Sequence, residues 1–118
     1  MPQAIVISGP QGCGKSRLAR EMAAARGPFA EIERDTFLST FRFGNILSRH
    51  PATIIVENAP AQVILDPKTR ALAESSRTEI SRKGREDQDV PTPTFIFCTS
   101  DAIPDDCGFR VIRMGAAK

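Results

Sequence analysis

One eight-residue segment near the start of the chain limits the possible folds more than any other part of the sequence. Gly9-Pro10-Gln11-Gly12-Cys13-Gly14-Lys15-Ser16 matches the pattern G-x-x-x-x-G-K-[S/T]. The residues before it, 4–8, are mostly apolar and predict a buried strand. The residues after it, 15–26, are good helix formers, and Gly27-Pro28 stops the predicted helix. A strand, a glycine-rich turn and a helix in this order are typical of an α/β domain.

The residue types of this segment suit the binding of a phosphate chain. Glycines let the backbone curl so that successive N–H groups point at phosphate oxygens. The helix that begins at Lys15 adds the positive end of its dipole. Lys15 is expected to reach the β- and γ-phosphates, and the Ser16 hydroxyl to ligate Mg²⁺. We therefore predict a nucleoside triphosphate site formed by consecutive residues, which are Gly9, Pro10, Gln11, Gly12, Cys13, Gly14, Lys15, Ser16 and Arg17.

Strand and helix patterns alternate along the rest of the chain. Apolar or β-branched runs predict strands at 29–33, near a sheet edge, and at 53–56, 94–98 and 110–114. A helix is expected within 67–76, whereas 36–48 has no clear pattern because Gly44 interrupts it. The alternation predicts one α/β domain, residues 1–118, built around a mainly parallel sheet.

A second predicted strand carries an acid where ligands bind in parallel sheets. Ile54-Ile55-Val56-Glu57-Asn58 places Glu57 at the carboxyl end of the strand. From there Glu57 can hold Mg²⁺ opposite Ser16. Asn58 stands where many ATPases carry a second carboxylate that polarises the attacking water. Because an amide cannot act as a base, the sequence predicts nucleotide binding and leaves weak turnover open.

Three segments together resemble a known family. Residues 9–16, 54–58 and the run Phe95-Ile96-Phe97-Cys98-Thr99-Ser100-Asp101 resemble the Walker A, Walker B and sensor-1 motifs of AAA+-type P-loop ATPases. Their layout is most similar to superfamily 3 helicases and related phage or plasmid replication ATPases. The resemblance implies a three-layer P-loop NTPase fold whose five sheet strands, numbered along the chain, lie in the order 5-1-4-3-2. It also implies that ATP and Mg²⁺ bind at the strand ends.

The same resemblance implies roles for single residues. Thr99 or Ser100 would be the polar sensor, with Ser100 standing where such proteins commonly have Asn. Arg110 occupies the neighbourhood of the family's arginine finger, which enters the site of a neighbouring subunit, so the active form is expected to be a homo-oligomer. Arg113 is the alternative, which strand alternation is expected to turn elsewhere. Lys15, Glu57, Asn58, Ser100 and Arg110 are thus the candidate catalytic residues.

A basic hairpin is expected between the second and third of these motifs. Residues 79–83 and 88–91 flank a polar stretch and suggest an exposed hairpin. In the families named above, a hairpin at this place carries a basic residue that contacts single-stranded DNA. By this resemblance the candidate nucleic-acid contacts are Arg82, Lys83 and Arg85. A charged, solvated face without a ligand is the alternative interpretation of the same residues.

Composition narrows the class of protein. The chain has 118 residues, with 16 Lys and Arg against 14 Asp and Glu, and the net charge of +2 does not by itself imply nucleic acid. That small total hides a basic segment, 66–85, followed by an acidic one, 86–106. No run of 18 apolar residues and no basic leader before an apolar block occur, so we expect a cytoplasmic protein without membrane contact. The three cysteines lack the paired spacing of a zinc site.

Three functions are compatible with these observations. The first is a Mg²⁺- and ATP-binding ATPase that acts as an oligomer with nucleic acid or a replication complex. The second is a small-molecule or nucleotide kinase, in which Asp35 would activate a substrate hydroxyl. The third is a nucleotide-gated binding module with little turnover, suggested by Asn58. The chain ends soon after the last predicted strand, so we expect a minimal core without the family's helical lid.

Overall fold

Five parallel strands form the central sheet of the computed structural model, which describes residues 4–80 and 88–115. They are β1 (Ile5–Ser8), β2 (Phe29–Glu33), β3 (Thr53–Glu57), β6 (Thr94–Thr99) and β7 (Arg110–Arg113). Their order across the sheet is β2-β3-β6-β1-β7. This order confirms the expected arrangement 5-1-4-3-2 and the edge position of the strand at 29–33. The fold is therefore the α/β type expected for a P-loop NTPase core.

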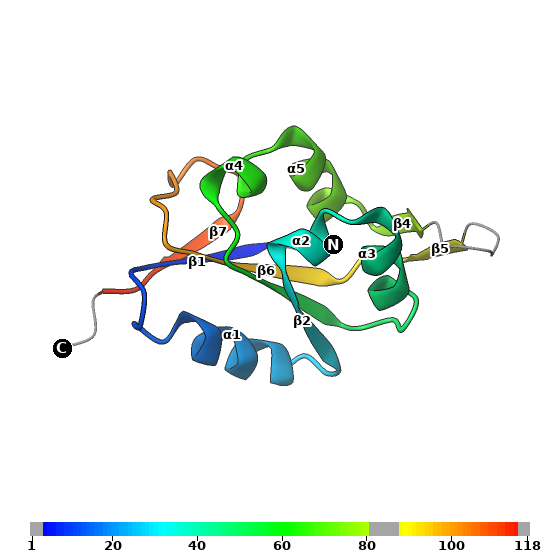
Figure 1. The fold of residues 1–118 in the computed structure, drawn as a ribbon, viewed down its shortest axis with the longest axis horizontal. Helices are drawn as coiled ribbons and strands as arrows, with labels where there is room; N and C mark the ends of the chain where they lie inside the picture. The colour runs from blue at the N-terminus through cyan, green and yellow to red at the C-terminus, as the bar shows by residue number, and fades with distance from the viewer. Residues whose placement is uncertain (1–3, 81–87, 116–118) are drawn as a thin grey trace.

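Helices cover both faces of this sheet, as Figure 1 shows. On one face lies α1 (Lys15–Ala24), which follows the glycine-rich loop. The other face carries four shorter helices, α2 (Arg34–Phe37), α3 (Thr40–Leu47), α4 (Ala61–Ile64) and α5 (Pro67–Glu74). The segment without a clear sequence pattern thus forms α2 and α3, and the N-cap Ser39 supplies the break between them by accepting a hydrogen bond from the Arg42 N–H.

Strand side chains alternate between the two faces, so the sheet has two hydrophobic cores. The core under α1 is small and aliphatic, and its buried residues are Ile5, Ile7, Ala19, Ala23, Ile55, Ile96 and Cys98. The opposite core is larger and contains the buried rings of Phe37, Phe95, Phe97 and Phe109. The Phe37 and Phe97 ring centroids are 5.7 Å apart with nearly perpendicular planes, an edge-to-face arrangement.

A separate antiparallel pair joins β4 (Arg77–Ile80) to β5 (Gln88–Pro91). It confirms the predicted second arm, 88–91, whereas the first arm begins two residues earlier than the predicted 79–83 and shares only Glu79 and Ile80 with it among the described residues. The expectation that this hairpin is exposed is wrong for one face, because alternation turns Ile80 and Val90 into the larger core. The Thr92 hydroxyl, just after β5, lies 3.1 Å from the Ser75 hydroxyl and 2.5 Å from that of Thr78. These contacts fix the root of the hairpin to the end of α5.

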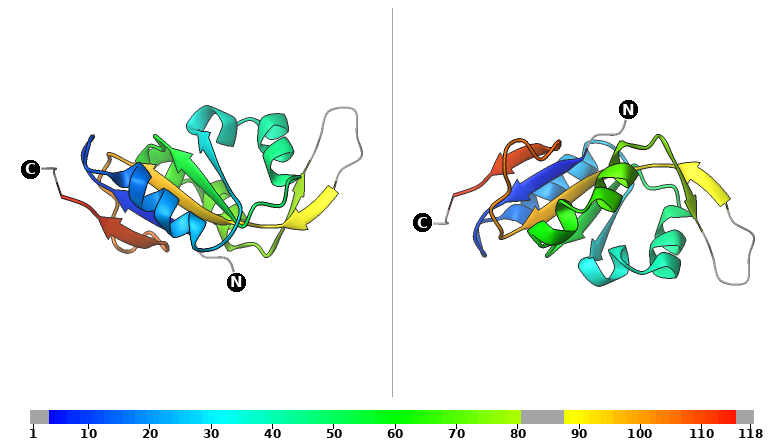
Figure 2. Two further views of the ribbon diagram at one scale, coloured as in Figure 1. Left: turned by 90° about the horizontal axis from the view of Figure 1, so that it is seen from below. Right: turned by 90° about the horizontal axis from the view of Figure 1, so that it is seen from above.

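The glycine-rich loop and the hairpin lie at opposite ends of the long axis of the molecule, as the views in Figures 1 and 2 agree. The candidate nucleic-acid residues Arg82, Lys83 and Arg85 fall between the hairpin arms, outside the described residues. Within the described ranges, no helix has the length and apolar character needed to span a bilayer.

Candidate functional site

The glycine-rich loop joins β1 to α1 at the carboxyl edge of the sheet. Gly14 is the N-cap of α1 with φ 94°, a left-handed conformation that other residues adopt only with strain. A Cβ atom on Gly9 would lie 2.8 Å from the Met114 carbonyl oxygen and 2.9 Å from Cys13 Sγ. The Gly9 N–H donates to the Thr99 carbonyl at 3.1 Å. The two glycines are therefore required where the loop turns and where it packs on β6 and the end of β7.

The start of α1 offers donors and a cation to an anionic ligand. The first N–H groups of a helix have no partner inside it, and the N-cap Gly14 has no side chain to satisfy them. Lys15 Nζ curls over the loop and donates to the carbonyl oxygens of Gly9 at 2.8 Å and Pro10 at 2.9 Å. Free backbone donors, a helix dipole and an ammonium group together suit a phosphate chain.

Ser16 and Glu57, the two residues predicted to hold Mg²⁺, are in contact. Ser16 Oγ donates to Glu57 Oε2 at 2.8 Å. The other carboxylate oxygen, Oε1, is buried and has no hydrogen-bond partner among the residues that the structure describes. A buried, unpartnered carboxylate oxygen beside a hydroxyl fits a hydrated Mg²⁺ ion.

The protein alone offers that ion few ligands. In the described parts of the chain no cluster of three or more His, Cys, Asp or Glu residues is arranged as a metal site. Ser16 and Glu57 would therefore share the ion with water and phosphate oxygens, which is the usual way in which proteins bind Mg²⁺ with a nucleotide. The ion would supply positive charge against the phosphate oxygens.

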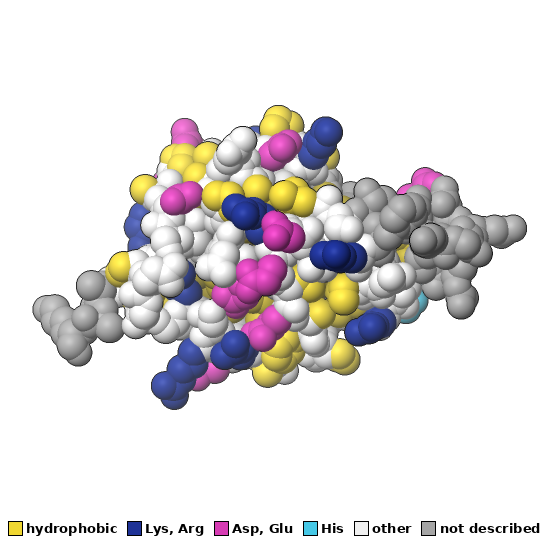
Figure 3. Space-filling view, viewed as in Figure 1, with side chains coloured by type: hydrophobic (Ala, Val, Ile, Leu, Met, Phe, Trp, Pro, Cys, Tyr) yellow, Lys and Arg dark blue, Asp and Glu magenta, His cyan; other side chains and the backbone are white. Residues whose placement is uncertain are grey.

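An acidic cavity of about 390 Å³ lies next to this pair, lined by Ser16, Arg20, Glu31, Ile32, Glu33 and Glu57. Arg20 Nε donates to Glu31 Oε1, and this hydrogen bond, with the attraction of the carboxylate, raises the pKa of Arg20. Figure 3 shows acidic side chains gathered near the middle of this face, over β2 and the start of α2. Arg20, Glu31 and Glu33 are site residues that the sequence motifs did not indicate, although the strand 29–33 ends in an acid, as β3 ends in Glu57.

Asn58 bridges two strands at this edge. Its φ of 53° is left-handed, a conformation that Asn tolerates better than most residues. Its Nδ2 donates to Glu33 Oε2 at 3.0 Å. The cavity beyond this contact, about 250 Å³, is lined by Glu33, Arg34, Asp35 and Asn58. The side chain that replaces the expected second acid thus holds an acid from the neighbouring strand.

The segment that resembles sensor 1 reaches the loop through Ser100. The Thr99 side chain is buried, and its hydroxyl accepts a hydrogen bond from the Asp101 N–H. Ser100 is exposed, and its Oγ accepts from Gln11 Nε2 at 3.3 Å. The Asp101 carbonyl accepts from Ser8 Oγ at 2.7 Å, and its carboxylate accepts from the Ala61 N–H at 2.8 Å. Of the two predicted sensors, Ser100 is the one whose hydroxyl faces the phosphate loop.

Three arginines of the sequence analysis lie apart from the acidic cavity. Arg17 extends along the exposed surface of α1, 3.6 Å from Glu21, so only its backbone N–H belongs to the loop region. Arg110 pairs with Ile5 at the amino end of β1, away from the loop. Arg113 pairs with Ser8 at the loop edge, and its guanidinium donates to Asp105 Oδ1 at 2.7 Å.

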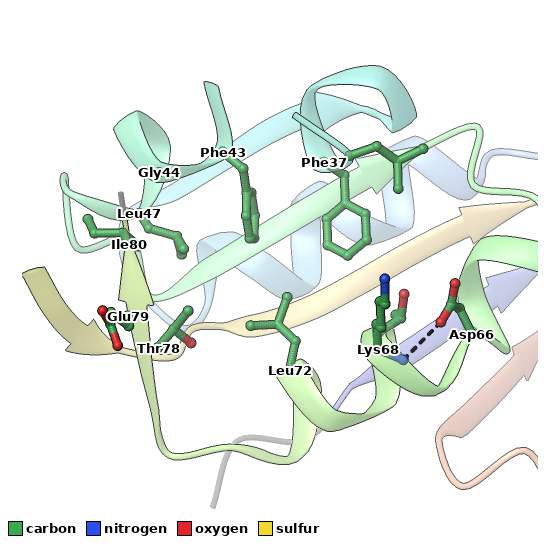
Figure 4. A pocket seen from close by; sticks show the side chains of 12 residues that line it. Phe37, Phe43, Gly44, Leu47, Asp66, Lys68, Leu72, Thr78, Glu79 and Ile80 are labelled. Atoms are coloured by element: carbon green, nitrogen blue, oxygen red, sulfur yellow. Dashed lines mark hydrogen bonds between the residues drawn. The ribbon is translucent and has the colours of Figure 1, made fainter. Parts of the chain in front are cut away.

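A third cavity, of about 320 Å³, is mostly apolar and remote from the loop. Figure 4 shows Phe37 from α2, Phe43 from α3 and Leu72 from α5 facing one another across it. Asp66, Lys68 and Glu79 add charged groups to its lining. The sequence analysis did not foresee this cavity, because it depends on how the short helices pack against β4.

No protein-family model and no curated protein matches the chain by sequence. Solved structures match its fold. Two structures of the C-terminal region of NrS-1 match, and the match covers 28% of each NrS-1 chain. The first has a TM-score of 0.69 at 18% identity over 96% of this chain. The second has a TM-score of 0.68 at 16% identity over 98% of this chain. A structure of JCV helicase with a bound thiazolopyridinyl-phenoxyphenyl acetamide matches with a TM-score of 0.65 at 18% identity, over 97% of this chain and 36% of the helicase chain. The chain therefore has a helicase-like fold and spans about a third of the length of these proteins.

Proposed function

We propose that this chain is the nucleotide-binding core of a Mg²⁺-dependent ATPase. The observation that carries the proposal is the 2.8 Å hydrogen bond from Ser16 Oγ to Glu57 Oε2. Beside it, Glu57 Oε1 is buried and has no hydrogen-bond partner in the described part of the chain. The hydrogen bond joins the end of the phosphate loop to the end of β3, the strand that carries the acid, where a magnesium–phosphate complex would bind. The fold shared with JCV helicase supports the same activity.

Each part of the loop has a role in this proposal. The N–H groups at the start of α1 bind the phosphate oxygens, and Lys15 exchanges the Gly9 and Pro10 carbonyls for the β- and γ-phosphates. Ser16 and Glu57 would hold Mg²⁺, which would supply positive charge against the phosphate oxygens. Ser100, already hydrogen-bonded to Gln11, lies at the loop and would sense the terminal phosphate.

Cys13 allows a direct test of nucleotide binding. It lies inside the loop and is half-buried, whereas Cys107, also half-buried, lies beside the distant residues Arg70 and Phe109. We expect saturating ATP and Mg²⁺ to slow the labelling of Cys13 by N-ethylmaleimide at least about tenfold and to leave Cys107 unchanged, as read by mass spectrometry. Lys15→Ala should remove the protection. Equal protection of both cysteines, or of neither, would contradict the proposal.

A single-stranded nucleic acid is the proposed partner of the hairpin. The hairpin arms project from the end of the molecule opposite the loop, and the basic residues Arg82, Lys83 and Arg85 lie between them in sequence. We expect single-stranded DNA to stimulate phosphate release, and Arg82→Ala with Lys83→Ala to abolish the stimulation. Arg26→Ala with Arg49→Ala, two exposed arginines elsewhere, is the matched control. Equal loss in both double variants would rule out a specific hairpin contact.

Oligomer formation follows from the proposed role of Arg110 on a neighbouring subunit. Arg110→Ala should bind ATP normally and hydrolyse it at least about 1,000-fold more slowly. Mixing it with Lys15→Ala should restore part of the activity, because each variant supplies what the other lacks. Absence of recovery, together with a monomeric mass in the presence of ATP, would exclude an arginine supplied in trans.

A kinase remains the second candidate, favoured by the cavity of about 250 Å³ that Asp35 lines with Glu33, Arg34 and Asn58. Its acceptor would bind there, and ADP would form only after an acceptor was added. Steady phosphate release in water alone supports the ATPase. A nucleotide-gated module, the third function, would bind ATP without releasing phosphate in either assay.

A further inference from the structure

A second acidic residue stands beside Glu57 at the carboxyl edge of the sheet. Glu33 is the last residue of β2, and the parallel register pairs it with Glu57, the last residue of β3. Neighbouring strands lie about 4.8 Å apart, so the two carboxylates leave the sheet side by side. Both line the cavity that also contains Ser16. Glu33 is therefore on the side of the phosphate loop where Mg²⁺ and the terminal phosphate would lie.

The Glu33 carboxylate is held toward β3. Glu33 is the N-cap residue of α2, a position where an acid usually bonds to the first free N–H groups, yet its side chain makes no capping bond. Instead Oε2 accepts a hydrogen bond from Asn58 Nδ2 at 3.0 Å. This hydrogen bond occupies one oxygen of the carboxylate and leaves Oε1 as an acceptor.

The charges around the cavity leave Glu33 without a cation. Arg20, the basic residue of its lining, is paired with Glu31. Arg34, next along the chain, lies 3.5 Å from Asp35. Among the described residues no ion pair involves Glu33, and the Asn58 amide is neutral. The Asn58 hydrogen bond thus orients the carboxylate, and no cation among the described residues is paired with the oxygen that would accept a proton.

We propose that Glu33 is the base that accepts a proton from the attacking water, and that Asn58 is the residue that positions it. This rests on the proposed ATPase function. The water oxygen forms a bond to the γ-phosphorus while the bond from that phosphorus to the bridging oxygen breaks, and ADP leaves with that oxygen and its electron pair. One water proton passes to Glu33 Oε1 and then to solvent, so ATP and water give ADP, inorganic phosphate and a proton.

This assignment accounts for Asn58. The amide that stands in place of a second acid does not remove the base from the site, because the base comes from the adjacent strand. Turnover then depends on two strands instead of one. It also separates the roles of the two acids, since Glu57 contacts Ser16 and Glu33 contacts Asn58.

Glu33→Gln is the direct test. Glutamine keeps the length of the side chain, and its carbonyl can still accept from Asn58, but it cannot take the proton. We expect the rate of ATP hydrolysis to fall about 100-fold or more, with the Kd for ATP and the urea midpoint unchanged. Glu74→Gln, an exposed glutamate that pairs with Arg70 on α5, is the matched control. Hydrolysis by Glu33→Gln within about threefold of wild type would overturn the assignment.

Asn58→Ala tests the positioning role. It should lower kcat about tenfold in the wild-type background and have no further effect on kcat in Glu33→Gln, because the amide acts through the carboxylate. Equal losses in both backgrounds would mean that Asn58 acts independently of Glu33. If Glu31→Gln, and not Glu33→Gln, greatly lowered the rate of ATP hydrolysis, the base would be Glu31. That result would also overturn the proposal.

The two proposals can fail separately. If the wild-type chain shows no nucleotide protection of Cys13, the proposed function fails and the role of Glu33 fails with it. If the chain binds and hydrolyses ATP while Glu33→Gln is as active as wild type, the ATPase stands and only the base assignment is wrong. If the chain binds ATP and releases no phosphate, the base assignment is wrong and the gated module is the better function.

Discussion

The two faces of the sheet are packed in different ways. Under α1 the helix contributes two alanines, Ala19 and Ala23, both fully buried against aliphatic strand residues. On the other face, phenylalanine rings fill the space beneath four short helices and still leave a cavity of about 320 Å³. Small side chains let a helix approach a sheet closely, whereas large ones fill a wide gap. The α1 face thus sets the distance from Ser16 to Glu57, and the phenylalanine face supplies most of the buried hydrophobic residues.

The largest expected effect is on the phenylalanine face. Phe97 is fully buried and its ring contacts those of Phe37, Phe95 and Phe109. Phe97→Ala should lower the free energy of unfolding by about 3–5 kcal/mol, measured by urea denaturation. Phe29→Ala, on the edge strand and 37% exposed, is the control and should cost far less. Similar costs for the two would show that the ring cluster does not carry the stability of this face.

A substitution in the α1 face should cost less stability than Phe97→Ala but should weaken ATP binding more. Ala19→Leu adds volume where α1 meets the sheet and should cost about 1–3 kcal/mol. Because the helix must move away from β3, the contact from Ser16 to Glu57 should open and the affinity for ATP should fall. Ala24→Leu, exposed on the same helix, keeps a good helix former without this strain. Equal ATP affinity in both variants would mean that α1 packing does not control the site.

The smallest expected effect is a pH dependence of stability that comes from the α1 face. Burial raises the pKa of the Cys98 thiol to about 12, whereas an unfolded thiol ionises near about 8.5. The native state therefore keeps the proton that the unfolded state loses, so stability is retained below about pH 8.5 and falls as the pH rises toward 12, by up to about 1.4 kcal/mol per unit. Urea midpoints measured between pH 8 and 10 should show a shallower decline in Cys98→Ala. Cys107→Ala should keep the wild-type slope.

The sequence predicts the α1 side of the molecule better than the other side. The motif at 9–16 specifies a strand, a loop and a helix by local chemistry, and Glu57 follows a run of β-branched residues. The contact of Ser16 with Glu57 then requires only that the two strands share an edge of the sheet. Short-range signals therefore suffice to predict the loop, the acid strand and the contact between them.

What could not be predicted depends on pairing across the sheet. Glu33 and Asn58 are 25 residues apart. The expected strand order places β2 beside β3, but nothing in either segment shows the register that pairs Glu33 with Glu57. The buried face of the hairpin likewise depends on its docking to the end of α5, which the contact between the Ser75 and Thr92 hydroxyls helps to fix. Strand alternation was the ground for expecting Arg113 to turn elsewhere. It could not indicate the partner of Arg113, because Asp105 lies in a loop without a periodic pattern. Long-range contacts of this kind leave no local signal.

Strand β6 connects the two ends of the molecule. It begins two residues after Thr92 at the hairpin root and ends at Thr99, beside Ser100 and the phosphate loop. Both of its edges are paired, with β1 and with β3, and a slip by one residue would turn every side chain to the wrong face. The strand is therefore a rigid connection of fixed length, about 20 Å for its six residues. β6 cannot slide along its neighbouring strands. Any coupling between the hairpin and a bound nucleotide must therefore use rotation of β6 or movement of the loops at its two ends.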